Sequence, residues 1–491
     1  MGRLKTAGIA TFLAIGGFLF GYDSGIISSS IAQPHFIEYM HNPDSAARGG
    51  IVSSFTGGAI LGALSVSLLA DKYGRKMTVF IGAIISIIGS ALQGGAANVG
   101  MVIAGRLIAG FSVGLLSAVV PMFCSEIATA EDRGKLSGLL QFMLSWGFFV
   151  AQWLGYGCFQ VDSHFQWRFP LAFQTVPGIV MGCGIWFMYE SPRWLVERER
   201  LEEAKVVLSK LHGTGSNHEF LELEFREIVD TITAEKQFAV WGWKDMIARP
   251  AWRKRLMLGM GIQAFGQLSG INVINYYGPQ IYEILGIDTG TSLQIIGISG
   301  SFSIVYCVIG LWLLDKVGRM KPLIVCSFGM AAALLVNSVL SKYFVLADNP
   351  SPNDNALRAM VAMNFVFSLF FTMIGIISWV YPAEIFPAEI RARGNSLSTM
   401  TNWSLNLVFA QCAPIALEDL GFGFFYFFFS WNLIAAVCYM VFFPETKGQT
   451  LEQMDRLFGD QLAVTAGKED VERAEAVETA ETVVVGERKG A

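Results

Sequence analysis

The sequence predicts an all-α membrane protein with twelve transmembrane helices in two pseudo-symmetric six-helix bundles. Three observations lead to this fold class. Only 15% of the 491 residues are charged and 53% are hydrophobic, whereas soluble proteins carry about 25% charged residues. Apolar runs of about 20 residues, the length that crosses a bilayer core, recur along nearly the whole chain. Similar charged motifs recur at matching places in the two halves.

Taken in chain order, the apolar runs give the twelve predicted spans. They cover residues 7–30, 49–70, 77–97, 101–123, 136–157, 169–189, 256–285, 292–314, 322–344, 358–382, 395–417 and 421–443. Lys and Arg gather in alternate loops and in both tails, and the opposite loops contain few of them. Because basic residues stay on the cytoplasmic side of a membrane, both termini are expected in the cytosol.

A long polar stretch in the middle of the chain divides the spans six and six. We expect an N-terminal bundle at 1–189, a cytosolic helical linker at 190–255, a C-terminal bundle at 256–443 and a mostly disordered cytosolic tail at 444–491. Apolar residues at helical spacing predict two amphipathic helices in the linker. They are Leu195, Val207, Leu208 and Leu211 for the first, and Leu221, Phe225, Ile228 and Ile232 for the second.

An internal repeat joins the two halves. Asp71-Lys-Tyr-Gly-Arg75 follows the second span, and Asp315-Lys-Val-Gly-Arg319 follows the eighth. The fourth and tenth spans each end in an acidic residue that is followed seven positions later by an arginine: Glu126 with Arg133, and Glu384 with Arg391. These charges predict a cytoplasmic gate whose pairs hold when the cytosolic side is shut. The alternative is that they are ordinary loop charges whose long side chains reach the membrane surface.

The seventh span carries polar residues that a lipid-facing helix does not need. They are Gln263, Gln267, Asn272 and Asn275, set among glycines and followed by Pro279. Gln267 and Asn272 are separated by about 140° on a regular helix, so only unwinding or a wide cavity face lets both reach one ligand. A discontinuous membrane helix with amide side chains is typical of a midplane binding site for a polar solute.

Asp23 is the one carboxylate, and Arg106 the one guanidinium, that the predicted spans place well inside the membrane. Ionisable residues at that depth are costly and usually functional. A positive neighbour favours the ionised form of an acid and burial favours its neutral form, so a residue that moves between such surroundings can carry a proton. The alternative is a static ion pair that holds the first and fourth spans together.

Together these motifs resemble the sugar porter family of the major facilitator superfamily, in its fungal branch, over about residues 7–458. The motifs in chain order are Phe20-Gly-Tyr-Asp23-Ser-Gly, Asp71-Lys-Tyr-Gly-Arg75-Lys, Gly105-Arg106, Glu126 with Arg133-Gly134, Glu190-Ser-Pro-Arg193-Trp, Gly270-Ile-Asn272, Tyr276-Tyr277, Asp315-Lys-Val-Gly-Arg319, Pro382-Ala-Glu384-Ile-Phe-Pro and Pro444-Glu445-Thr-Lys-Gly. The resemblance implies the major facilitator fold and transport of a monosaccharide or polyol.

The resemblance also implies which side chains serve the sugar. Neutral amides match hydroxyl groups as donor and acceptor, and tryptophan offers a flat apolar face to the ring. The implied contacts are Gln141, Gln267, Asn272, Trp379 and Asn402, with Phe20 as a further candidate and Gln263, Tyr277, Trp403 and Asn406 beside the cavity. The chain departs from the family at Gly266, where a second glutamine is usual, at Ser303 in place of an asparagine, and at 375–379, which lacks the common prolines.

For the charged residues, the resemblance implies a proton switch made of Asp23 and Arg106. It also adds Glu190, Arg193 and Glu445 to the cytoplasmic gate, whose other members are Asp71, Arg75, Glu126, Arg133, Asp315, Arg319, Glu384 and Arg391. Facing outward, Asp23 would take a proton and release Arg106. Facing the cytosol, Arg106 would favour the ionised form, and the proton would leave with the sugar.

The sequence thus predicts a transporter that imports a monosaccharide, a hexose or pentose, with a proton by alternating access. Three alternatives stay open: a passive sugar facilitator, a polyol or glycerol–proton symporter, and a transporter-like sugar sensor. No enzyme activity, cofactor, metal or nucleic-acid partner is expected, since the seven cysteines lie singly and no catalytic constellation is present. The expected partners are a sugar, a proton and the bilayer, and the expected state is a monomer in the plasma membrane.

Overall fold

A computed structural model describes residues 2–127, 133–212, 243–344, 353–387 and 390–447, with short pieces between 221 and 233 and between 454 and 459. These residues form helices and connecting loops, and no strand occurs among them. The tail that was predicted to be disordered begins at residue 444. Only 444–447 and the pieces between 454 and 459 of this tail are among the described residues.

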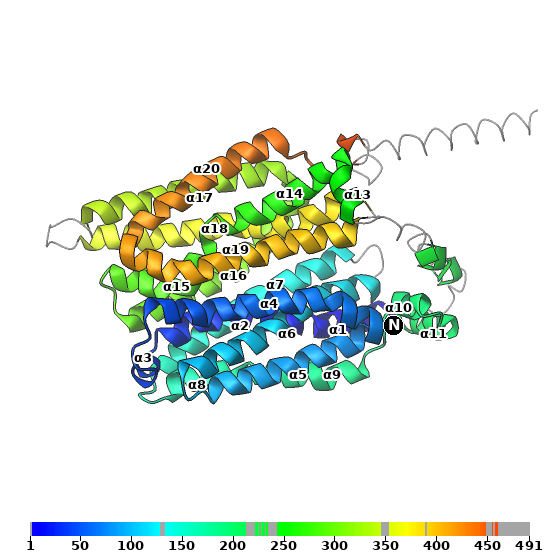
Figure 1. The fold of residues 1–491 in the computed structure, drawn as a ribbon, viewed down its shortest axis with the longest axis horizontal. Helices are drawn as coiled ribbons and strands as arrows, with labels where there is room; N and C mark the ends of the chain where they lie inside the picture. The colour runs from blue at the N-terminus through cyan, green and yellow to red at the C-terminus, as the bar shows by residue number, and fades with distance from the viewer. Residues whose placement is uncertain are drawn as a thin grey trace, which may run out of the picture.

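The N-terminal half contains the first six membrane crossings. Its helices are α1 (Gly2–Leu13), α2 (Ile15–Ile31), α3 (Pro34–Tyr39), α4 (Ser45–Tyr73), α5 (Arg75–Gly94), α6 (Val99–Ile127), α7 (Arg133–Phe159), α8 (Phe165–Phe173), α9 (Thr175–Gly184) and the short 3-10 turn η1 (Ile185–Phe187). Figure 1 shows them as the blue and cyan layer of the molecule. The linker follows with α10 (Pro192–Glu197), α11 (Leu201–His212) and α13 (Trp243–Ala248).

The C-terminal half forms the second, green-to-orange layer (Figure 1). Its helices are α14 (Pro250–Gln267), α15 (Ile271–Ile284), α16 (Thr289–Val317), α17 (Met320–Phe344), α18 (Asp354–Ile385), α19 (Arg391–Leu420), the 3-10 turn η2 (Gly421–Phe424) and α20 (Phe425–Phe442). We call the end of the molecule at which α10, α11 and α13 lie the linker end, and the opposite end, at which α3 lies, the α3 end (Figure 1).

The predicted fold class is confirmed. Nine described stretches are long and apolar enough to cross a membrane, and the last of them, Arg393–Phe442, joins α19 and α20. Helix α7 and the broken pair α14–α15 complete the twelve crossings. The helices extend a few residues past the predicted spans because their caps lie beyond the apolar core. For example, the Asp44 carboxylate accepts a hydrogen bond of 2.7 Å from the backbone N–H of Ala47 at the start of α4.

Inside the N-terminal half, α4 and α6 touch backbone to backbone. A Cβ atom added to Gly58 or Gly62 of α4 would lie 2.0 or 2.1 Å from a carbonyl oxygen of α6, and one added to Gly110 or Gly114 of α6 would lie equally close to a carbonyl of α4. Small residues let membrane helices approach this closely and gain van der Waals contact. The two helices therefore behave as one packed unit.

Between the halves, α4 lies against α19 toward the α3 end. The Ser45 hydroxyl donates to the Glu418 carboxylate at the start of this seam. About two turns further, the Ser53 hydroxyl donates to Oε1 of Gln411 at 2.7 Å. A residue pair of the opposite seam, between α7 and α16, also bonds directly, with Nε1 of Trp153 donating to the Ser301 hydroxyl at 2.9 Å.

Toward the linker end, α19 no longer packs against the same face of α4. Gly57 on this face still meets the Leu407 side chain of α19. Positions 61, 64 and 68 continue the face at helical spacing, and there Leu61, Leu64 and Leu68 are 55%, 48% and 73% exposed. The two halves therefore meet at the α3 end and diverge toward the linker end, so that the interior of the molecule opens on the linker side.

The first linker helix is shorter than predicted. Leu195 lies in α10, separated from Val207, Leu208 and Leu211 of α11 by a break at which Glu199 has a φ of 61°. The prediction of one continuous helix is therefore wrong, because the chain turns at residues 198–200. The apolar residues still gather, since Leu195 and Leu208 pack with Phe225 and Ile232 in one cluster.

Candidate functional site

The predicted break in the seventh crossing is present at the middle of the molecule. Helix α14 ends at Gln267, and α15 begins at Ile271 after Gly270, whose φ of +96° suits glycine alone. The turn carries Asn272 back over the end of α14, and its Nδ2 donates a hydrogen bond to Oε1 of Gln267. Two amides that would point apart on a regular helix thus lie together at the break.

A second amide pair fastens three helices of the C-terminal half. Nε2 of Gln263 in α14 donates to the backbone oxygen of Ser378 in α18 at 2.8 Å. Oε1 of Gln263 accepts from Nδ2 of Asn402 in α19 at 2.7 Å. Gln263 and Asn402 are buried and bond to each other, so in this conformation they act as a tie between helices rather than as open ligands.

Open space lies next to the break. A Cβ atom at Gly266 would have no heavy atom within 4 Å, and the ring of Trp379 in α18 is 41% exposed although the helix is in the bundle. Gln141 of α7, in the other half, is partly buried. Gln141 and Trp379 are predicted sugar contacts that are not fully buried in this conformation, and their place beside the break stays a prediction.

Aromatic residues near the break join α19 to its neighbours. The rings of Phe20 in α2 and Trp403 in α19 meet across the halves with centroids 5.5 Å apart. The Tyr277 hydroxyl donates to the carbonyl oxygen of Ala410 at 2.5 Å, and the side chain is fully buried. Tyr277 therefore ties α15 to α19 in this conformation, and a role of Phe20 and Tyr277 in the sugar site stays a prediction.

One contact between the two halves near the break was not predicted from the sequence. The Thr56 hydroxyl of α4 donates to Oδ1 of Asn406 in α19 at 3.4 Å, and Nδ2 of Asn406 donates to the Tyr276 hydroxyl at 3.3 Å. Asn406 was expected beside the cavity, but nothing in the spacing of the sequence pairs it with Thr56. The contact links α4, α19 and α15 at the level of the break.

The two ionisable residues predicted inside the membrane form a pair. Nη1 of Arg106 in α6 donates to Oδ1 of Asp23 in α2 at 2.8 Å and to its backbone oxygen at 3.0 Å. Both side chains are at least 99% buried. The guanidinium also lies over the Phe55 ring, 4.4 Å from its centroid. The pair sits entirely within the N-terminal half.

The pair is incompletely hydrogen-bonded. Oδ2 of Asp23 and Nε and Nη2 of Arg106 have no hydrogen-bond partner among the described residues. Gln174, at the break between α8 and α9, interacts with the Asp23 carboxylate, and its Oε1 accepts from the Ser90 hydroxyl at 3.2 Å. Buried polar groups without partners are rare in native structures and call for a functional explanation, here an unused acceptor on Asp23 and unused donors on Arg106. Gln174 was missed, although Pro170 and Pro177 on either side of it mark a break in the sixth crossing, because its approach to Asp23 depends on how these helices pack on α2.

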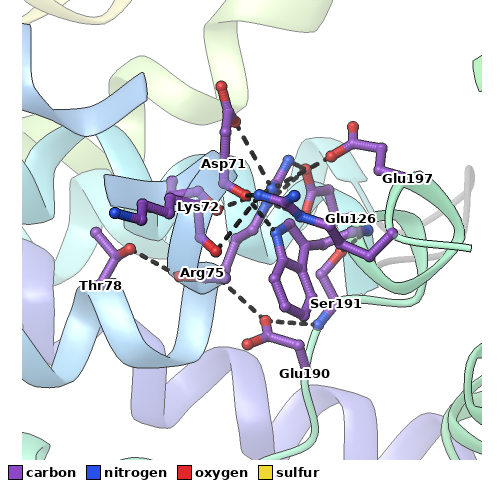
Figure 2. Close-up of polar contacts among 12 residues, drawn as sticks. Asp71, Lys72, Arg75, Thr78, Glu126, Glu190, Ser191 and Glu197 are labelled. Atoms are coloured by element: carbon purple, nitrogen blue, oxygen red, sulfur yellow. Dashed lines mark hydrogen bonds and ion pairs between the residues drawn. The ribbon is translucent and has the colours of Figure 1, made fainter. Parts of the chain in front are cut away.

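At the linker end of the N-terminal half, Arg75 is surrounded by carboxylates (Figure 2). Its guanidinium bonds Glu126 at 2.8 Å, lies 3.5 Å from Glu197 and 3.9 Å from Asp71. The Glu190 carboxylate accepts from the backbone N–H groups of Arg75 and Lys76 at 3.1 and 3.2 Å. Glu190 thus caps the N-terminus of α5, where a negative charge is favoured.

The C-terminal half repeats this arrangement. The Arg319 guanidinium bonds Glu384 at 2.6 Å. The Glu445 carboxylate accepts from the backbone N–H groups of Arg319 and Met320 at 2.9 and 3.0 Å, as Glu190 does in the other half. Gly74 and Gly318, one residue before each arginine, have φ values of 93° and 89°. We call each of these arginine–glutamate sets a brace.

The two capping glutamates differ in their surroundings. Burial raises the pKa of Glu190 against the opposing effect of its backbone hydrogen bonds and of Arg75. At Glu445 burial acts in the same direction but four backbone hydrogen bonds outweigh it, and the pKa is lowered. Glu445 in the C-terminal brace therefore stays ionised to a lower pH than Glu190 in the N-terminal brace.

Of the other predicted gate residues, the structure describes side-chain contacts for some and not for others. Nε of Arg391 donates to the carbonyl oxygen of Phe386 at 3.1 Å, and Arg193 lies near Glu197. The side chains of Arg133 and Asp315 lie outside the described residues. The brace pairs Arg75–Glu126 and Arg319–Glu384 each lie within one half in this conformation. A gate that pairs one half with the other stays a prediction.

The chain matches proteins of one kind over nearly its whole length. A family model described as "Sugar (and other) transporter" covers residues 9–458. The MFS-type transporter criB of Aspergillus cristatus is 36% identical over 485 residues, which are 98% of this chain and 99% of that protein. The high-affinity glucose transporter of Kluyveromyces lactis is 33% identical over 469 residues, 92% of this chain and 85% of that protein.

Solved structures show the same fold. The proton:xylose symporter XylE bound to 6-bromo-6-deoxy-D-glucose superposes with a TM-score of 0.76 at 24% identity, covering 93% of this chain and all of that one. The inward open conformation of XylE from E. coli superposes with a TM-score of 0.74 at 24% identity, covering 92% and 99%. With the match of the family model, the twelve crossings and the repeated brace, the protein is a multi-pass membrane protein that belongs to the sugar transporter family.

Proposed function

We propose that the protein imports a monosaccharide together with a proton by alternating access. The observation that carries this proposal is the helix break at Gln267–Asn272, where two amides lie together next to the open space at Gly266. Relatives named as glucose and xylose transporters support a sugar as substrate. The fold and its repeated brace support a carrier built from two half-domains that rock about a central site.

In this proposal the linker end faces the cytosol. Basic residues gather in the loops and tails at that end, as the positive-inside rule requires. The conformation described above is then inward-facing, with a closed outside and an open cytosolic interior. The protein acts as a monomer in the plasma membrane with both termini in the cytosol.

Sugar recognition follows from the chemistry at the break. A hydroxyl group both donates and accepts, and so does each carboxamide of Gln141, Gln267 and Asn272. The Trp379 ring covers the C–H face of the sugar. Gln263 and Asn402 hold the helices at the position where those groups converge, and they contact the sugar only if their own bond opens.

Proton coupling follows from the buried pair. A proton on Asp23 removes its charge and weakens the bond to Arg106, after which α2 is free to close over a bound sugar. Ionised Asp23 restores the bond seen here. Each cycle thus carries one proton with one sugar, and the free Oδ2 of Asp23 is the atom that accepts it.

A passive facilitator with the same sugar site is the second candidate. One observation favours it: Asp23 and Arg106 are fully buried and joined within a single half, which is also the geometry of a static structural pair. A sugar site without proton coupling would equilibrate its substrate and never concentrate it.

The deciding experiment measures uptake of labelled hexoses, pentoses and polyols in cells that lack their own carriers, at acidic and near-neutral external pH, with and without a protonophore. Accumulation above the external level that collapses with the protonophore is the expected result. Equilibration that ignores the protonophore would establish the facilitator instead. Surface-expressed protein that moves none of the compounds would contradict transport and favour a sensor.

Trp379→Ala should weaken sugar uptake while leaving the protein inserted in the membrane. An aromatic face is worth about 1.5 kcal/mol, or about tenfold in apparent affinity. The ring is 41% exposed, so its loss removes little packing. Uptake kinetics of Trp379→Ala are compared with those of Trp312→Ala, which truncates another exposed ring, 60% accessible, on α16. Equal KM values for the two variants would remove Trp379 from the site.

Gly266→Gln should change the preference among sugars. The added side chain enters space with no heavy atom within 4 Å of its Cβ, so it adds an amide without a clash. One neutral hydrogen bond is worth about 1 kcal/mol, which is about fivefold between two sugars that differ in one hydroxyl. Gly266→Leu, of similar volume but without the amide, is the matched control. The same substrate profile for both variants would show that volume, not hydrogen bonding, matters at this position.

A further inference from the structure

A second polar cavity lies between the halves, on the α3 side of the helix break. In this conformation it has about 20 Å³ of space for the centres of water-sized molecules. Its polar lining comes from four helices and consists of Gln152, Asn275, Tyr282, Ser299, Asn364 and Ser368. We call it the outer cavity. Its walls lie close together in this conformation, so it suits water rather than a sugar ring.

Two of the lining amides lack partners. Gln152 of α7 is 6% exposed, and its Oε1 has no hydrogen-bond partner among the described residues. The Asn275 carboxamide of α15 is partly exposed and makes no hydrogen bond to the described residues. A buried polar atom without a partner costs free energy comparable to a lost hydrogen bond, so the Gln152 oxygen in particular points to a partner that is present at another stage.

The other amide of the cavity wall is already satisfied. Nδ2 of Asn337 donates to Oδ1 of Asn364 at 2.9 Å, and Nδ2 of Asn364 donates to the Tyr282 hydroxyl at 3.4 Å. This chain of bonds fixes the wall formed by α15, α17 and α18. Oδ1 of Asn337 keeps no partner among the described residues, but it does not line the cavity. Gln152 and Asn275 are set apart by lining the cavity from opposite walls.

The packing around Gln152 brings its oxygen close to the C-terminal half. A Cβ atom at Gly300 of α16 would lie 2.2 Å from Oε1 of Gln152. Glycine at this position admits the amide into the seam between α7 and α16. The Trp153–Ser301 hydrogen bond closes the seam next to it. Because Gln152 belongs to the N-terminal half and the other lining residues to the C-terminal half, separation of that seam opens the outer cavity.

The outer cavity continues the central site. Asn275 lies three residues after Asn272, on the same side of α15, and Tyr282 lines the same cavity beyond the kink of α15 at Tyr277. A line of polar groups thus runs from the helix break to the closed end of the molecule. A solute that enters from the α3 end meets these groups before it reaches Gln267 and Asn272.

We propose that the outer cavity is a second binding subsite for the transported neutral sugar, used when the α3 end is open. The amides of Gln152 and Asn275 then bind hydroxyl groups of the entering sugar, and closure of the seam squeezes the cavity to the size seen here and leaves the amides unpaired. The subsite rests on the proposed function, since its ligand is the transported sugar. It acts only on the outer face, so it raises the apparent affinity for influx and leaves that for efflux unchanged.

The test compares the two faces of the membrane with radiolabelled D-glucose and D-xylose. External KM is measured for influx into cells, and internal KM for uptake by inside-out vesicles from the same cells. Asn275→Leu and Gln152→Met, on opposite walls, each remove one amide at similar volume. Each is expected to raise external KM about fivefold, the effect of one neutral hydrogen bond, and to leave internal KM unchanged.

Two controls separate the subsite from its neighbours. Asn272→Leu, at the central break, should raise KM on both faces. Gln166→Met removes another buried amide, whose Oε1 also lacks a partner among the described residues but which does not line the cavity, and should leave both KM values unchanged.

The outcomes divide cleanly. If wild type transports either sugar and both cavity variants keep the wild-type external KM, or raise KM equally on the two faces, the subsite is refuted while the proposed function stands. If wild type moves neither sugar, the choice of these sugars as ligands is refuted for both sites. If only one variant reaches the membrane, that variant is the test: a raised external KM with an unchanged internal KM supports the subsite, and equal changes on the two faces refute it.

Discussion

Asp23→Asn is expected to abolish accumulation of sugar while leaving exchange of sugar across the membrane intact. Asparagine matches the shape of the carboxyl group but takes up no proton. The variant therefore keeps the space around Arg106 and loses the link to the proton gradient. Each unit of pH difference is worth about 1.4 kcal/mol, or about tenfold in accumulation for one proton per sugar. Wild type should concentrate sugar by that factor, and Asp23→Asn should reach only the external level.

The measurement is net accumulation in energised cells together with counterflow in cells without a gradient. Counterflow reports the rocking of the loaded carrier and needs no net proton movement, so it controls for folding and surface expression. Ser24→Ala is a matched control, because it alters the neighbouring buried residue of α2, whose hydroxyl has no hydrogen-bond partner among the described residues. Concentrative uptake by Asp23→Asn that still collapses with a protonophore would move the coupling residue elsewhere.

Arg106→Met is expected to be the most destabilising single change in the N-terminal half. It leaves the Asp23 carboxylate at least 99% buried without the cation that lies 2.8 Å away. Removing one partner of a buried ion pair costs about 3–5 kcal/mol. The apparent melting temperature of the detergent-solubilised protein should fall strongly, and surface expression should fall with it.

The double variant Asp23→Asn with Arg106→Met gives the decisive control. It removes both charges, so most of the lost stability should return although transport stays uncoupled. If the double variant melts as low as Arg106→Met alone, the loss comes from the packing of the guanidinium on Phe55 rather than from the unpaired carboxylate. Buried pairs replaced on both sides by neutral groups are often as stable as the original, which is why the comparison is sharp.

The sequence alone was enough to predict the crossings and the main break. Long apolar runs reveal membrane helices because the bilayer core sets their length. The polar residues of 263–279 reveal a break because amides and glycines are out of place on a lipid-facing helix. The repeated Asp-Lys-x-Gly-Arg motifs pointed to matching structures, and Arg75 and Arg319 indeed lie in braces of the same geometry.

Other parts of the site could not be predicted, because they depend on contacts between distant segments. The Gln263–Asn402 bond joins residues 139 positions apart, and only the packing of α14 on α19 brings them together. Gln174 lies at a break between α8 and α9, and only the packing of these helices on α2 brings it near Asp23. Gln152 reads as one polar residue in an apolar helix, and its role in the outer cavity appears only when α16 is placed against it through Gly300.

The close backbone contact between α4 and α6 has a consequence for how rigidly the N-terminal half moves during transport. Where Gly58 and Gly110 lie against the opposite carbonyl oxygens, no side chain separates the two helices, so α4 and α6 cannot move closer together. We therefore expect them to move as one rigid unit along the contact with α19. Substitutions at the glycines of the α4–α6 contact should lower the melting temperature without altering which way the carrier faces. Substitutions along the contact with α19, such as Gln411→Leu at its bond with Ser53, should do the reverse.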